Sequence, residues 1–155
     1  MSSATETAAN GNAPTWGDLV EDWVGDAFGL EYVDESYYDF LDDDGTKVET
    51  KGAQVWINNG YRNGKQQRTR GRFKFWSGSH DELVAEDGDY ILVVYEEDDD
   101  GDINVLAVQR VKAATVTEFV GGCWYDVRSN PRVASKGDPY RLSWSKVFPL
   151  SEVEG

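Results

Sequence analysis

The sequence lacks several features on which particular classes of protein depend. Its single cysteine, Cys123, has no second cysteine for an internal disulfide and no ligand partner at metal-binding spacing, so neither a disulfide scaffold nor a zinc site is expected. No run of about 18 apolar residues occurs, and no basic start precedes an apolar segment, so we expect neither a spanning helix nor a signal peptide. The expectation is therefore a soluble cytoplasmic protein with no membrane partner.

Positive charge is also scarce. The 155 residues include 15 Lys and Arg against 29 Asp and Glu, which gives a formal net charge of −14. Asp accounts for 17 of the acidic residues and Lys for only 7 of the basic ones, a surface composition that suggests a halophilic protein. The total charge argues against a nucleic-acid partner, because binding to phosphates normally needs a positive field.

One long stretch runs against this overall charge. No Asp or Glu occurs between Thr50 and His80, whereas Lys and Arg alternate there with small polar residues and then with aromatic ones. Cations can contact phosphates, small residues let the backbone approach, and an aromatic ring can stack on a base. DNA is therefore the expected partner, although the cations could instead balance the acidic surface. The predicted DNA-binding residues are Arg62, Lys65, Arg68, Arg70, Arg72 and Lys74.

The length fits one domain, expected over residues 15–155 with a core at 15–111 and a C-terminal extension at 112–155. Residues 1–14 have too few apolar side chains to offset their ordering entropy and are expected to form a disordered tail. Apolar residues at helical spacing predict a helix over 16–28, begun by a Thr15 capping box with Asp18 and ended by Gly29. Residues 58–78 are interpreted mostly as a loop with a ribbon.

Other patterns predict further elements. Residues 90–95 are a continuous apolar run, typical of a strand buried on both faces. The order helix, three strands, helix, strand is typical of a three-layer α/β fold in which helices flank a central mixed sheet. Further strands are predicted at 30–33, 37–41, 47–57, 103–111 and 140–148, the last of which is expected to close the sheet. Further helices are predicted at 79–87, begun by a capping box of Ser79 and Glu82, and at 113–120.

One hairpin is expected to pair two carboxylates. If Gly45 adopts the left-handed conformation in a three-residue loop, Asp39 lies opposite Glu49, with Cβ atoms about 4.5–5.5 Å apart. Such a pair repels unless a cation lies between, and Mg²⁺ accepts one or two carboxylates and completes its shell with water and phosphate oxygens. Lys51 points to the same face, where its amine can orient or deprotonate a water and neutralise charge on a phosphate.

The pattern of Asp39, nine intervening residues, Glu49, Thr50 and Lys51 after an amphipathic helix resembles the PD-(D/E)XK nuclease superfamily. This superfamily includes restriction endonucleases, archaeal Holliday junction resolvases and exonuclease domains of repair enzymes. The resemblance covers about residues 15–96, with Tyr38 in place of the family's proline. It implies a restriction-endonuclease-like αβββαβ core and a nuclease that hydrolyses DNA phosphodiester bonds. Asp39 and Glu49 would bind Mg²⁺, or Mn²⁺ as an alternative, and Lys51 would assist the attacking water.

The resemblance also implies helpers around this triad. Family members often add an acidic ligand from the first helix, for which Glu21 is the main candidate and Asp26 the weaker one. Gln54 stands at the spacing of a further catalytic residue. In a regular strand, however, Gln54 points away from Glu49, so its role requires a β-bulge at Gly52.

A second hypothesis stays open beside the enzyme. Glu-x-Lys can arise by chance on a solvated hairpin, and the fold would then serve as an inactive module that binds nucleic acid or a protein partner. An approach of Glu21 or Gln54 to the paired carboxylates would favour the enzyme. His80 is expected to have a surface or capping role, and residues 98–102 a solvated turn rather than a calcium loop. The substrate form and a homodimer are left open.

Overall fold

A computed structural model describes residues 15–33, 35, 37–120 and 139–154, so that Cys123 and the predicted tail lie outside the described residues. A five-stranded sheet lies at the centre, and β3 and β7 are its parallel pair while the other neighbours run antiparallel. This mixed sheet confirms the predicted fold class. In spatial order its strands are β1 (Glu31–Tyr32), β2 (Phe40–Leu41), β3 (Lys47–Gln54), β7 (Asp89–Glu97) and β8 (Ile103–Lys112).

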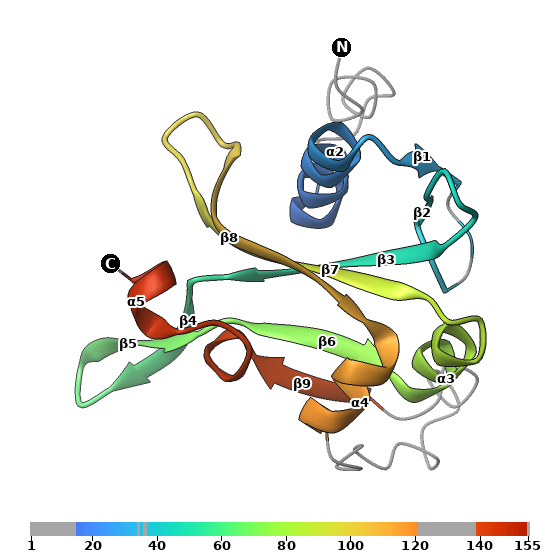
Figure 1. The fold of residues 1–155 in the computed structure, drawn as a ribbon. Helices are drawn as coiled ribbons and strands as arrows, with labels where there is room; N and C mark the ends of the chain where they lie inside the picture. The colour runs from blue at the N-terminus through green and yellow to red at the C-terminus, as the bar shows by residue number, and fades with distance from the viewer. Residues whose placement is uncertain (1–14, 34, 36, 121–138, 155) are drawn as a thin grey trace.

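Helix α2 (Trp16–Phe28) covers one face of this sheet, and a second layer of helices and two small sheets covers the other (Figure 1). No helix in the described ranges is long and apolar enough to cross a membrane. The small sheets pair β4 (Trp56–Arg62) with β5 (Lys65–Arg70), and β6 (Arg72–Trp76) with β9 (Pro139–Ser143); the helices are α3 (Ser77–Ala85), α4 (Ala113–Val120), α5 (Leu150–Val153) and the 3₁₀ turn η2 (Trp144–Lys146).

The sequence dictates α2 in detail. The Thr15 hydroxyl accepts a hydrogen bond from the Asp18 amide and the Asp18 carboxylate accepts one from the Thr15 amide, so the predicted capping box is present. Gly29 ends the helix in the left-handed conformation, at φ 64°. Val20 and Val24, one turn apart, are buried against the sheet. The first helix is confirmed at both ends.

Strand β7 is buried on both faces, as its apolar run predicts. Ile91, Val93 and Tyr95 join the core beneath α2, and the residues between them join the larger core of the opposite layer. Burying each large apolar side chain contributes about 1.5–3 kcal/mol. Described residues beyond residue 111 complete this larger core: Val116, Val120, Leu142, Trp144, Phe148 and Val153.

Three predicted elements end or pair differently from expectation. The strand expected at 47–57 is split at Val55, where the indole N–H of Trp144 donates to the Val55 carbonyl at 2.9 Å and holds the bend. Residues 58–78, interpreted mostly as a loop with a ribbon, are instead mostly strand, namely the β4–β5 hairpin followed by β6. Strand β9 pairs with β6, in register Phe73 to Leu142, and does not close the central sheet. These departures depend on contacts far apart in the sequence.

Helix α3 also corrects two predictions. It begins at Ser77, and its N-cap Trp76 makes no side-chain hydrogen bond, so the expected capping box at Ser79 is wrong. His80 is only 1% exposed rather than on the surface. Its ring hydrogen-bonds the Tyr90 hydroxyl at 2.9 Å and the Thr117 hydroxyl at 2.7 Å. A buried histidine is tolerated there because both ring nitrogens have partners.

Candidate active site

The hairpin between β2 and β3 sets the predicted register. Gly45 is left-handed at φ 84°, and the Asp42 amide donates to the Thr46 carbonyl at 2.9 Å. Phe40 then pairs with Val48, and the Asp39 amide donates to the Val48 carbonyl at 2.9 Å. This register places Asp39 opposite Glu49 and is confirmed.

The Asp39 carboxylate lies at the edge of β3. Strand β2 starts only at Phe40, so the Thr50 amide has no ladder partner from that strand. The Asp39 Oδ2 atom accepts this hydrogen bond at 3.0 Å, and the side chain is only 8% exposed. Two hydrogen bonds, one from its amide and one to its carboxylate, therefore fix Asp39 before any ligand arrives.

Glu49 and Lys51 point to the face of the sheet that lies away from α2. In the parallel register Glu49 is beside Tyr90 and Lys51 beside Leu92, and both neighbours lie in the core of the opposite layer. Burial and then a hydrogen bond with Asp39 raise the pKa of Glu49 to about 9, while the charge of Lys51 opposes the rise. The structure therefore brings Asp39, Glu49 and Lys51 together.

Glu21 lies on α2, across the sheet from the face to which Glu49 and Lys51 point. It is half-buried, and its negative charge further raises the pKa of Glu49, whereas Asp26 is exposed near the end of the same helix. Within the described residues no three acidic, histidine or cysteine side chains come close enough to form a metal cluster. The close carboxylate pair is Asp39 and Glu49, and Glu21 acts on it over a longer distance.

Gln54 lies on the other face, and its predicted catalytic role needs correction. The β3–β7 pairing runs in unbroken register from Val48 to Gln54, so β3 has no bulge at Gly52. Burial raises the pKa of Tyr95, and a hydrogen bond with Gln54 opposes that rise. Because Gln54 is bound to Tyr95 beneath α2, it is removed from the candidate catalytic group.

The predicted basic residues occupy four different settings. Arg62 and Lys65 lie at the exposed tip of the β4–β5 hairpin, and Arg68 stacks over Trp56 at 4.9 Å. Arg70 forms an ion pair with Glu154 at 2.9 Å, so its charge is already engaged. Arg68 also lines a hollow with Glu96 and Glu97, which brings acidic groups beside part of the predicted DNA-binding set.

The remaining two, Arg72 and Lys74, lie on the exposed side of β6. Arg72 lines a hollow of about 290 Å³ with Gly52, Gln54 and Arg141. Arg141 was missed by the sequence reasoning, because only the β6–β9 pairing brings it opposite Lys74. Arg72 and Arg141 therefore reach the part of β3 that follows Lys51.

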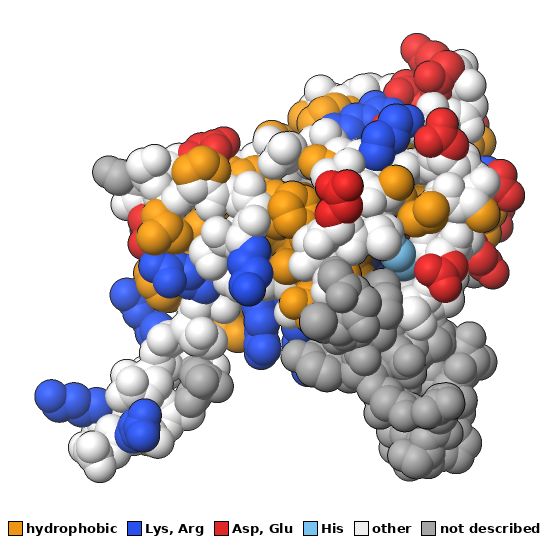
Figure 2. Space-filling model, turned by 60° about the horizontal axis from the view of Figure 1, so that its bottom comes forward, with side chains coloured by type: hydrophobic (Ala, Val, Ile, Leu, Met, Phe, Trp, Pro, Cys, Tyr) orange, Lys and Arg blue, Asp and Glu red, His pale blue; other side chains and the backbone are white. Residues whose placement is uncertain are grey.

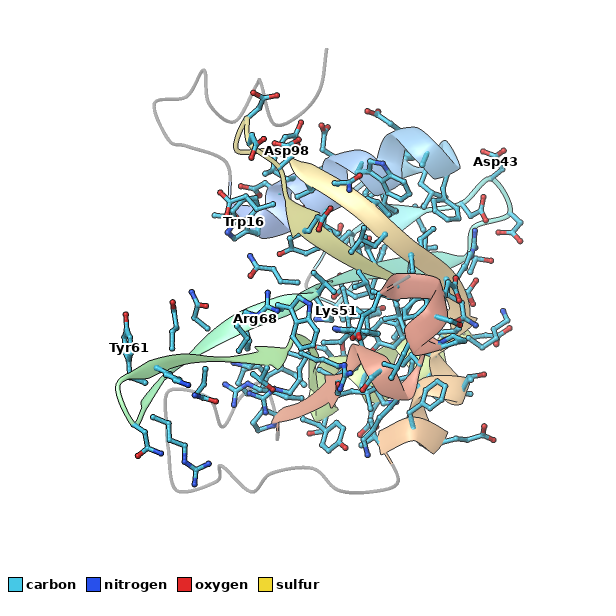
Figure 3. The ribbon with its side chains drawn as sticks, turned by 90° about the vertical axis from the view of Figure 1, so that its left-hand side faces the viewer. Trp16, Asp43, Lys51, Tyr61, Arg68 and Asp98 are labelled. Carbon is cyan, nitrogen blue, oxygen red and sulfur yellow. The ribbon has the colours of Figure 1, made fainter. Side chains whose placement is uncertain are left out.

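The acidic turns lie elsewhere. Figure 3 places Asp43 and Asp98 toward the α2 side of the molecule and Tyr61 and Arg68 toward the other side. In the space-filling view, Lys and Arg extend from the hairpin across the adjoining surface, while most visible acidic side chains gather at the opposite side (Figure 2). Asp98 accepts hydrogen bonds from the Asp100 and Asp102 amides, so this turn is held by its own backbone.

Comparison with known proteins agrees with this geometry. The chain matches the family model described as PD-(D/E)XK nuclease superfamily domain over residues 7–149, well beyond the span 15–96 on which the sequence resemblance was based. No curated protein matches it. With most of the sequence inside one family model and the mixed sheet in place, the chain belongs to the PD-(D/E)XK nuclease superfamily.

Proposed function

We propose that the protein is a metal-dependent nuclease that hydrolyses phosphodiester bonds of DNA. The observation that carries the proposal is the meeting of Asp39, Glu49 and Lys51 on one face of the β2–β3 hairpin. Superfamily membership supports nuclease activity as the general class. The metal, the substrate and the residue roles are the proposed parts.

The paired carboxylates fit a divalent cation. Burial and the neighbouring Asp39 make ionisation of Glu49 unfavourable, and a cation between the two groups would offset both effects. Mg²⁺ needs only one or two protein carboxylates, so a two-carboxylate site suffices, and Mn²⁺ can take the same oxygen ligands. A bound ion would supply positive charge to the scissile phosphate. Glu21 would add to the negative field that attracts the ion.

Lys51 has a separate role. Its amine carries the positive charge that Glu49 senses on the same strand face. There it can hold the attacking water in line by hydrogen bonding and compensate charge that develops on the phosphate. Asp39 and Thr50 keep the edge of β3 in place through their 3.0 Å hydrogen bond. Together these residues hold substrate and water in position for hydrolysis.

The test is cleavage of labelled duplex, junction and single-stranded DNA with Mg²⁺ in multimolar KCl. We expect the wild type to cleave at least one form and Asp39→Ala to lose cleavage. Glu82→Ala, which removes an exposed carboxylate on α3, is the matched control and should cleave normally. Wild-type activity in Asp39→Ala would contradict the assigned site. Binding without cleavage of any form would support the inactive binding module instead.

A further inference from the structure

The β4–β5 hairpin, called here the arm, projects from the body directly after the strand that carries Glu49 and Lys51 (Figure 1). Its turn places Asn63 and Gly64 at positive φ, as a two-residue hairpin turn requires. From Asn58 to Arg68 every described side chain is exposed, and Tyr61 near the tip is 76% exposed. A two-stranded ribbon exposed on both faces buries little apolar surface of its own.

The base of the arm is nevertheless well held. Arg68 and Arg70 stack over Trp56 at 4.9 and 5.3 Å, and Arg70 also contacts Glu154 and the Trp144 ring. Anchoring at the base fixes the direction of an arm whose described outer side chains are exposed. Such a projection is suited to a partner that reaches both of its faces.

The charge of the arm indicates what that partner is. Arg62 and Lys65 are paired directly opposite each other, although like charges in this position destabilise a ribbon. No Asp or Glu occurs in the arm, in a chain of net charge −14. A second opposed pair, Lys74 and Arg141, lies on the neighbouring β6–β9 ribbon. Repulsion between Arg62 and Lys65 would be relieved by a polyanion that contacts both cations at once.

The shape of the arm selects among polyanions. The major groove of B-form DNA, about 12 Å wide, admits a two-stranded β-ribbon, whereas the major groove of double-stranded RNA is too narrow. Single strands are bound through rows of aromatic side chains, but the outer arm presents one aromatic residue, Tyr61, among Asn, Gln, Lys and Arg. Gln66, Gln67 and Asn58 carry the amide groups that hydrogen-bond base edges.

We propose that the arm enters the major groove of double-stranded DNA, with Arg62 and Lys65 on phosphates. The ten residue steps from Lys51 to Tyr61 span at most about 33 Å, close to one turn of B-form DNA. The groove contact would thus lie within about one turn of the phosphate at Lys51. This inference rests on the proposed function, which gives DNA as the substrate, and adds that the DNA is double-stranded and that the arm contacts its major groove.

The test measures binding of the full chain to one 30-bp sequence as duplex DNA, duplex RNA and single-stranded DNA, in EDTA, by fluorescence anisotropy over a KCl series. Arg62→Gln/Lys65→Gln should weaken duplex DNA binding and flatten the slope of log affinity against log salt by about 1.8, or about 0.9 per lost contact. Lys112→Gln/Lys146→Gln removes two cations outside the arm and should bind like the wild type.

A second probe identifies the groove. Duplex DNA that carries glucosylated hydroxymethylcytosine has a filled major groove, and the wild type should bind it only as tightly as the arm variant binds plain duplex. Equal wild-type binding to both duplexes, or tighter binding to RNA or single strands, would overturn the proposal. So would an arm variant that binds DNA normally but changes from dimer to monomer in light scattering, because the arm would then contact a second copy.

The two proposals fail separately. If Asp39→Ala abolishes cleavage while the arm variant binds duplex DNA like the wild type, the nuclease stands and the groove contact is wrong. If the arm variant loses duplex binding but the wild type cleaves no DNA form with Mg²⁺, the groove contact stands and hydrolysis is wrong. Circular dichroism of each variant in multimolar KCl confirms that it is folded.

Discussion

Replacing Glu49 by glutamine tests the electrostatic description of the carboxylate pair. Burial and Asp39 raise the pKa of Glu49 from 4.5 to about 9 in the folded protein, while the unfolded chain keeps the ordinary value. Between these values the folded state retains a proton that the unfolded state has lost. The free energy of unfolding of the wild type should therefore fall as pH rises through this window. Glu49→Gln is neutral throughout and should escape this loss.

The magnitude follows from linkage. Each pH unit in the window costs the wild type about 1.4 kcal/mol relative to Glu49→Gln, because one proton separates the folded and unfolded states. Between pH 5.5 and 7.5 the difference in unfolding free energy should grow by about 2–3 kcal/mol in favour of the variant.

The assay is urea unfolding followed by tryptophan fluorescence at several pH values, in one fixed KCl concentration and without divalent metal. Glu82→Gln, which changes an exposed carboxyl on α3, is the matched control and should give no pH-dependent difference. If the wild type and Glu49→Gln lose stability in parallel as pH rises, the pKa of Glu49 is not raised in the folded protein, and the electrostatic description of the carboxylate pair is wrong.

Three further outcomes are expected. Mg²⁺ binding at pH 7.5 should release up to one proton from the wild type and none from Glu49→Gln, because the ion displaces the proton that the raised pKa of Glu49 retains. Calorimetry in two buffers of different ionisation enthalpy measures the number of protons released. Equal proton release from both proteins would contradict this expectation. Thr50→Val should stabilise the fold by about 1 kcal/mol in urea unfolding, because the Thr50 hydroxyl is buried with no partner among the described residues, and a loss of stability would reveal a hidden one. Gly71→Ala should lower the free energy of unfolding by at least about 2 kcal/mol, because a Cβ at residue 71 would collide with the Gln54 carbonyl. The control Gly17→Ala has room in α2 and should be neutral or stabilising. Equal effects of the two variants would show that the β3 backbone moves to accommodate the added Cβ.

Local chemistry made much of this fold predictable. The Thr15 cap, the Gly29 stop and the left-handed Gly45 each depend on neighbours within a few residues, and the register that pairs Asp39 with Glu49 follows from Gly45. The apolar run of β7 likewise determined a strand buried on both faces. The core of the candidate site was therefore within reach of sequence reasoning.

The rest depended on long-range contacts. The bend at Val55 is held by Trp144, which is 89 residues away in the sequence, so no local pattern indicates where β3 ends and the β4–β5 hairpin begins. His80 is buried because Tyr90 and Thr117 supply its hydrogen bonds, which no local pattern indicates. Arg141 joins the basic surface only through the pairing of β9 with β6. The positions of these residues depend on tertiary packing, which a local sequence pattern does not indicate.

The most direct test of the central claim is the single-turnover cleavage rate of Lys51→Ala, measured beside its Mg²⁺ affinity by calorimetry. Lys51 is proposed to act on water and phosphate while Asp39 and Glu49 hold the metal. We therefore predict that the variant loses at least about 100-fold in cleavage rate, the lower range for a lost acid–base or charge-stabilising group, and binds Mg²⁺ at least as well as the wild type. Cleavage by Lys51→Ala at the wild-type rate would contradict the account.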